Sequence, residues 1–246
     1  MCDKMTSHLF RMNDGPVVYT IDSHSDTRMA LGIGDQDESY CDVEWCKGSC
    51  EPEIRFPASW HDDQREYCVN WYASHMPTRD AMMRWCVLNG ASVQIVPGEE
   101  SVLDGVHALP KCEWLYCRYC IGLTSLPALP ECKALNCPGC TGLTSLPELL
   151  KCRTLNCPGC TGLTSLPELL KCTTLYCPGC TGLTSLPELL KCTTLYCYGC
   201  TGLTSLPELL KCKWIYCGDC TGLTSLPELL KCTTLYCDDR LRKTRN

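Results

Sequence analysis

The amino-acid sequence predicts a repeat solenoid that follows a small capping domain, and three observations lead to this prediction. A 20-residue unit recurs from Cys112 to Cys237. Twelve of its residues, TGLTSLPELLKC, appear verbatim in five successive copies. Twenty of the 26 cysteines occupy three fixed positions of the unit, so they belong to the repeat pattern. A unit this short cannot bury its own apolar face, and it must stack on its neighbours.

Residues 1–90 are predicted to form an acidic capping domain that is helical or irregular. Residues 1–110 carry 18 acidic and 8 basic side chains, a net charge of −10. A capping box at Ser59–Asp62 and the Pro77-Thr78 pair predict two helices, near residues 59–74 and 78–89. In residues 1–55 only Val17–Asp22 suits a strand, and we assign nothing else there. We expect the helical pair to cover the open apolar end of the first coil.

Residues 91–237 are predicted to form about eight coils, the first of which is degenerate and contains a strand at Val93–Val96. Seven further strand segments begin at the cysteines that open each copy. Side chains alternate along a strand, so Leu175 and Cys177 should point inward, whereas Thr174 and Tyr176 should point outward from a concave parallel sheet. A proline in every copy favours an extended convex side. Residues 238–246 form a basic tail that we expect to be solvated.

The unit resembles a leucine-rich repeat. Cys172–Cys180 fits the pattern L-x-x-L-x-L-x-x-N/C, with cysteines at the first and third Leu positions and at the final N/C position. Together with LTSLPELL, it looks like the short repeats of bacterial type III effectors, and residues 70–96 resemble their helical N-terminal cap. The resemblance implies a concave parallel sheet and an extended convex side. Cysteine-substituted copies are also similar to repeats of large cytoplasmic DNA viruses, which implies a viral origin.

Some bacterial relatives add a ubiquitin-ligase domain with a Cys-x-Asp nucleophile. Cys237-Asp238-Asp239 mimics this triplet, but only nine residues follow Cys237, and we reject the match. No other catalytic signature is present, since a Cys68–His75 pair has no supporting motif. The sequence therefore predicts a protein that is not an enzyme.

Differences among the copies from residue 141 onward fall on the strand and the turn after it, which is typical of a recognition surface. Tyr and Trp dominate interface hot spots, so we expect a host or virion protein to bind there. The alternative is a structural component, either a rigid spacer or a minor virion protein, that is held by side or end contacts and whose aromatic ladder only stabilises the sheet. The predicted binding residues are Trp114, Tyr116, Tyr176, Tyr196, Tyr198, Trp214, Tyr216 and Tyr236.

Three interpretations of the repeat cysteines remain open: small buried thiols, disulfides between adjacent coils, or ligands of zinc or an iron–sulfur cluster. The repeat pattern explains each of them without a metal, so we expect no cofactor. In the capping domain, Cys41, Cys46 and Cys50 with His61 or His75 form a weaker zinc candidate, because their spacing fits no standard finger.

Composition also limits the setting of the protein. No apolar run approaches the roughly 18 residues of a membrane-spanning helix, and the first residues lack the pattern of a secretory signal. We therefore expect an intracellular or virion protein that does not bind membranes. The net charge of −6 gives nucleic-acid binding little support. Rows of Glu and Lys that repeat with the unit are expected to be solvated and to relieve each other's repulsion.

Overall fold

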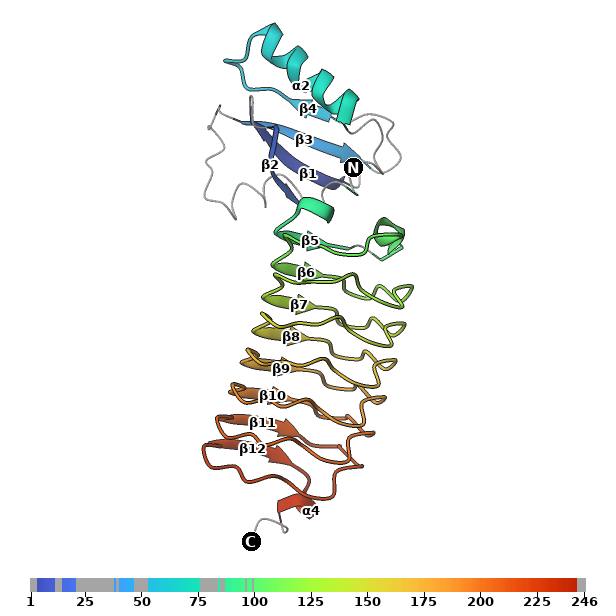
Figure 1. The fold of residues 1–246 in the computed structure, drawn as a ribbon, viewed down its shortest axis with the longest axis vertical. Coiled ribbons are helices and arrows are strands. Elements are labelled where there is room, and N and C mark those ends of the chain that lie inside the picture. Colours follow the sequence, from blue (N-terminus) through green and yellow to red (C-terminus); the bar gives the residue numbers. More distant parts are fainter. Residues whose placement is uncertain are drawn as a thin grey trace. The chain divides into compact units, whose positions relative to one another are not determined.

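The fold is described from a computed structural model that covers residues 4–11, 15–20, 38, 40–46, 53–75, 84, 87–95, 97–98 and 100–242 (Figure 1). The chain divides into two compact units, residues 1–94 and 95–246. Each unit is described by itself. The predicted boundaries at residues 90 and 237, and the covering of the first coil, remain predictions.

The first unit contains a four-stranded antiparallel sheet of order β2-β1-β3-β4. Its strands are β1 (Lys4–Arg11), β2 (Gly15–Thr20), β3 (Tyr40–Cys46) and β4 (Glu53–Arg55). A helix, α2 (Asp62–His75), follows. Its buried core joins β3 to the helix through Cys41, Val43, Trp60, Cys68 and Tyr72. Only β2 was predicted from the sequence. The strand β3 was overlooked although Cys41, Val43 and Trp45 alternate with Asp42 and Glu44, whereas β1 and β4 carry no such pattern.

The helix α2 begins later than the sequence predicted. Gln64 Oε1 accepts a hydrogen bond of 2.8 Å from the backbone N–H of His61, so the reciprocal part of a capping box lies at His61–Gln64 and not at Ser59–Asp62. Asp62 and Asp63 then occupy the first turn, where carboxylates favour the positive end of the helix dipole. Most of the helix predicted near 78–89 lies outside the described residues, and residues 87–89 are helical.

The second part of the fold is the predicted solenoid, which confirms the leucine-rich-repeat fold class. Eight parallel strands are stacked in the order β12-β11-β10-β9-β8-β7-β6-β5, and successive repeat strands pair with an offset of 20 residues, as Leu195 does with Leu175 (Figure 1). A 3-10 turn, η1 (Glu100–Leu103), lies in the first coil. The strands are β5 (Ser92–Gln94), β6 (Trp114–Tyr116), β7 (Ala134–Asn136), β8 (Thr154–Asn156), β9 (Thr174–Tyr176), β10 (Thr194–Tyr196), β11 (Trp214–Cys217) and β12 (Thr234–Cys237).

Burial alternates along each repeat strand as predicted. The central residue, such as Leu175, is fully buried, whereas its neighbours Thr174 and Tyr176 are partly exposed. Between residues 104 and 238, all of which are described, the segments that return to the next strand contain no helix. The convex side is therefore extended, because the proline in each copy removes a backbone donor that a helix would need.

One glycine of each copy permits the coils to approach closely. A Cβ atom added to Gly182 would lie 2.6 Å from the carbonyl oxygens of both Thr161 and Leu163, which belong to the preceding coil. Both contacts are with backbone, so no side-chain rotation would relieve them. The spacing of the stack therefore requires a residue without a side chain here.

We predict that Gly182→Ala lowers the free energy of unfolding by about 1–3 kcal/mol, because the added methyl group forces two coils apart. Urea denaturation would measure this. The matched control is Gly218→Ala, since a Cβ at Gly218 meets nothing within 4 Å. Equal losses in the two variants would contradict the close-approach explanation.

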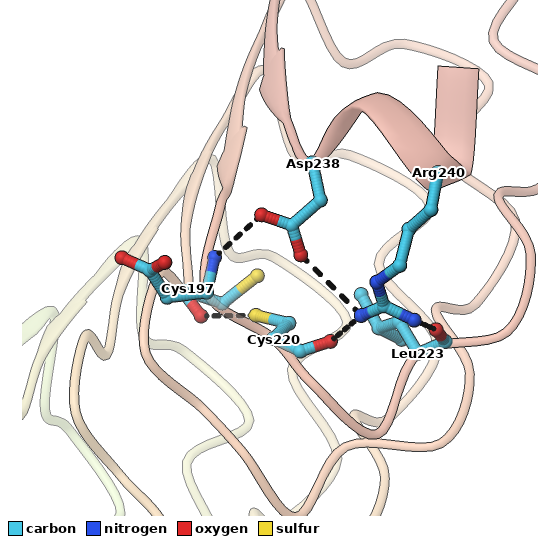
Figure 2. Close-up of polar contacts among 6 residues, drawn as sticks. Cys197, Cys220, Leu223, Asp238 and Arg240 are labelled. Carbon is cyan, nitrogen blue, oxygen red and sulfur yellow. Dashed lines mark hydrogen bonds and ion pairs between the residues drawn. The ribbon is translucent and has the colours of Figure 1, made fainter. Parts of the chain in front are cut away.

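The last coil ends on a short helix, α4 (Asp239–Arg242), in which Leu241 is buried. The beginning of the tail is thus packed and not solvated as predicted. Figure 2 shows Arg240 at the position where other coils have a cysteine, with its guanidinium donating to the carbonyls of Cys220 and Leu223. The Asp238 carboxylate accepts from both Arg240 and the backbone N–H of Asp219. Arg240 therefore supplies charged donors to two backbone carbonyls near the end of the stack, and one of them, that of Cys220, also accepts from the Leu223 N–H at 3.0 Å.

We predict that Arg240→Ala costs about 1–2 kcal/mol of stability, because two carbonyls lose a charged donor. Arg240→Lys should restore only part of this, since an ammonium group lacks the planar fork of a guanidinium. Thermal unfolding would compare these variants with Arg242→Ala, whose side chain forms no hydrogen bond within the described residues. An Arg240→Ala variant as stable as the wild type would contradict the prediction, because water would then fully replace the hydrogen bonds from the guanidinium to the two carbonyls.

Candidate protein-binding face

The outer face of the repeat sheet is built from the first and third residues of each repeat strand. Because the strands pair with a 20-residue offset, equivalent residues form straight columns across the sheet. One column runs from Trp114 to Thr234, and the next runs from Tyr116 to Tyr236. Equivalent residues that are 20 positions apart in the sequence therefore lie about one strand spacing apart, roughly 4.8 Å.

Four tyrosines of the second column form a continuous stack at the C-terminal end of the sheet. Ring centroids are 5.1 Å apart for Tyr176–Tyr196, 4.3 Å for Tyr196–Tyr216 and 5.7 Å for Tyr216–Tyr236. The middle pair is parallel within 4°. Such contacts stabilise a sheet, so part of what these rings do is structural. Three of the four are half-buried, and Tyr236 at the end of the stack is exposed.

Two more predicted residues widen the stack. Trp214 lies on the same strand as Tyr216, two positions earlier, and 42 % of it is exposed. The Nζ atom of Lys213 lies 5.9 Å from the centroid of its ring. Tyr198 is 46 % exposed, and its hydrogen bond with Tyr176 raises the pKa of the Tyr176 hydroxyl. Within the described part of the chain, no other aromatic ring stacks on Tyr198 or Trp214.

The other two predicted residues form a separate cluster at the first repeat strand. Trp114 and Tyr116 are both exposed, and the Lys133 ammonium lies 5.4 Å above the Trp114 ring. Lys133 also forms an ion pair of 2.7 Å with Glu113. Two strands with smaller outward residues, β7 and β8, separate this cluster from the tyrosine stack. The eight predicted residues therefore form two groups and not one uninterrupted strip.

Two exposed features of the solenoid were not predicted from the sequence. Tyr119, 59 % exposed, has a positive φ of 55° at the turn position where the next four copies have glycine. A comparison of that turn column would have revealed it. An exposed leucine column, from Leu150 to Leu230, was also overlooked, because it lies within the part of the unit that does not vary.

The repeat cysteines pack as small buried residues, and in the described copies they also act as hydrogen-bond donors. The thiol at the third position, for example Cys160, donates to the backbone carbonyl of Cys137 in the preceding coil at 2.9 Å. The thiol at the first position, for example Cys172, donates to the Thr174 carbonyl at 3.2 Å. These contacts support the first of the three interpretations, in which the thiols replace leucine and asparagine.

Burial keeps many of these thiols protonated. It raises the pKa of Cys132, Cys172 and Cys217 to about 12 in each case, with smaller contributions from neighbouring thiols. Among the described residues, no group of three His, Cys, Asp or Glu side chains is placed to hold a metal ion. In the first unit, the Sγ atoms of Cys41 and Cys68 lie 3.6 Å apart in the core, and Cys50 is outside the described residues.

Comparisons with known proteins add limited information. No family model matches the sequence, and no curated protein matches it either. Among solved structures, the chain is similar to the leucine-rich repeat domain of the type III effector XopL, at 18 % identity and a TM-score of 0.35. That match covers 74 % of this chain and 92 % of the other. No helix in the described residues is both long and apolar enough to cross a bilayer.

We predict that the stability contributed by Cys132, Cys172 and Cys217 is lost as the pH rises above about 9, where unfolded thiols begin to ionise. The raised pKa values of Cys132, Cys172 and Cys217 mean that the folded chain keeps protons that the unfolded chain releases. Each such thiol contributes a loss of about 1.4 kcal/mol per pH unit between the two pKa values, and none below them.

Urea denaturation from about pH 8 to about pH 11 would measure this loss. Tyrosine and lysine also titrate in this range, so the informative quantity is the difference between the wild type and Cys172→Ala. We expect the variant to be less stable at pH 8 and to have a shallower decline. Parallel pH profiles would contradict the assigned cause.

Proposed function

We propose that this protein is a non-catalytic scaffold that binds a protein partner on the concave face of its solenoid. The observation that carries the proposal is the group formed by Tyr176, Tyr196, Tyr216 and Tyr236 with Trp214 and Tyr198 beside them. Large, stiff aromatic side chains lose little conformational entropy on binding and dominate interface hot spots. An exposed aromatic patch on a regular surface is typical of an interaction site.

The charges beside the patch favour a protein over a nucleic acid. Lys213 lies beside the Trp214 ring, and Asp219 and Asp238 follow strands β11 and β12 at the C-terminal end of the sheet. A surface that carries both signs gains little from the release of phosphate counterions. An intracellular or virion setting, with a host or virion protein as partner, belongs to the same proposal.

The stack itself raises the structural alternative, in which the array is a rigid spacer. Stacking accounts for Tyr196, whose ring is covered on both sides by Tyr176 and Tyr216. It does not account for Tyr198 or Trp214, which lie outside the stack and are 46 % and 42 % exposed. These two residues therefore separate binding from sheet stabilisation.

We predict that Trp214→Ala and Tyr198→Ala weaken binding of a selected peptide at least about tenfold, because hot-spot aromatics contribute more than about 1.4 kcal/mol. The probe is a peptide selected from a random displayed library on the wild-type protein, and calorimetry measures its affinity for each variant. Their thermal stability should stay close to that of the wild type.

The matched control is Ser205→Ala, an exposed residue of the convex segment. Tyr196→Ala should lower stability by about 1 kcal/mol through the lost stacking, whatever its effect on binding. Selected peptides whose affinity is indifferent to Trp214 and Tyr198 would overturn the proposed face and favour the spacer.

A further inference from the structure

A column of exposed leucines runs along the turn that leads into each strand of the later copies. Its members are 40–67 % exposed: Leu150, Leu170, Leu190, Leu210 and Leu230. They occupy the second position of a four-residue turn, as in Leu169–Cys172, where the Cys172 N–H donates to the Leu169 carbonyl at 3.0 Å. We call these five residues the leucine ridge.

The fold does not require leucine at this position. The first two copies have the same turn, with Cys112 N–H donating to Leu109 and Cys132 N–H to Leu129, both at 3.2 Å. There the second turn residue is Pro110 or Pro130. Proline suits this position because the second residue of such a turn needs a φ near about −65°. In residues 100–242, none of the five ridge N–H groups donates a hydrogen bond. The ridge therefore exposes apolar area without a structural need for it.

Two rows of charge lie on either side of the ridge. In each coil an exposed glutamate precedes the ridge leucine by two residues and an exposed lysine follows it directly, as Glu188 and Lys191 do around Leu190. In the described part of the chain, one ion pair involves these rows: Lys151 pairs with Glu131, which belongs to neither row. The expected mutual relief of the two rows thus includes no ion pair between them in the described residues. The members without an ion pair are Glu148, Glu168, Glu188, Glu208 and Glu228 with Lys171, Lys191, Lys211 and Lys231.

We propose that the leucine ridge binds the ridge of a second copy of this chain, with the two solenoids parallel. A two-fold axis along the ridge places each Glu row opposite the partner's Lys row and packs leucine against leucine. The antiparallel arrangement would oppose Glu to Glu and Lys to Lys, which costs free energy. A second copy also has the same coil-to-coil spacing, so every coil meets its equivalent without loss of register.

The ridge is about 20 Å long, from four strand spacings. A single column of leucines over this length covers less area than the roughly 800 Å² that each partner buries in a standard interface. We therefore expect a reversible dimer that forms at high protein concentration and weakens as salt screens the charge rows. The ridge is distinct from the aromatic patch, so this inference does not depend on the proposed function.

The first experiment is sedimentation velocity over a range of concentrations at low salt, with the full chain. The wild type should move from its one-chain mass of 27.4 kDa towards twice that mass. The triple variant Leu170→Pro, Leu190→Pro, Leu210→Pro uses the residue that the first two copies already have at this turn. It should keep the wild-type circular dichroism spectrum and remain at the one-chain mass. Trp214→Ala is the control and should dimerise as the wild type does.

A charge exchange tests whether rows of opposite charge face each other across the dimer. One triple variant, Glu168→Lys, Glu188→Lys, Glu208→Lys, has lysine on both sides of the ridge, and another, Lys171→Glu, Lys191→Glu, Lys211→Glu, has glutamate on both. Each alone should stay at the one-chain mass, whereas an equimolar mixture should dimerise. A mixture that stays at the one-chain mass would overturn the pairing of Glu rows with Lys rows.

Three other outcomes would overturn the proposal. One is a wild type that keeps its one-chain mass at every concentration, and another is a proline variant that dimerises as strongly as the wild type. The third is a wild type that does not dimerise but sediments with phosphatidylserine vesicles, which would assign the ridge to a lipid surface. If Trp214→Ala loses peptide binding but still dimerises, the aromatic patch and the leucine ridge act independently, and each proposal can be tested without the other.

Discussion

The structure of the solenoid depends on one constraint: a coil of 20 residues has no interior of its own. Its strand finds backbone partners only in the neighbouring coils, as when Cys157 N–H donates to the Tyr176 carbonyl at 2.8 Å. Its leucines and cysteines are buried only because another coil lies above or below. Gly182 lets the coils reach that spacing, and Arg240 supplies donors where the stack stops. The repeat residues and the residues at the end of the stack therefore both serve to satisfy the packing and hydrogen bonding of coils that have no interior of their own.

The same constraint organises the surface. Whatever side chain stands at an outward position of one copy is placed about one strand spacing from its equivalent in the next. On the sheet, this produces the stack from Tyr176 to Tyr236. On the turn, it produces the leucine ridge and its rows of charge. A single exposed leucine needs no explanation, but five in a column form a continuous apolar surface.

Repetition also explains why prediction from the sequence differed between the two units. In the repeats, Leu175 and Cys177 could be assigned inward positions because each copy confirmed the phase of the others. In the first unit nothing repeats, and the three-residue strand β4 carries too short a pattern to reveal itself. There the Ser59–Asp62 motif led to a predicted start of α2 that is too early. In the structure, the side chain of Gln64 makes the reciprocal contact with the backbone of His61. Local motifs of this kind compete, and packing selects among them.

By itself, the sequence determined the period, the parallel sheet with its inward and outward columns, and the role of the repeat cysteines as part of the core pattern. These follow from side-chain periodicity, which is a local property of the chain. Only the tertiary structure decided that the tyrosines stack while Trp214 and Tyr198 stay open, and that Trp114 and Tyr116 form a separate cluster. It also decided that Leu149 is buried whereas Leu150 is exposed. Two adjacent leucines are equivalent in composition, and only the direction of the turn between convex segment and strand distinguishes them.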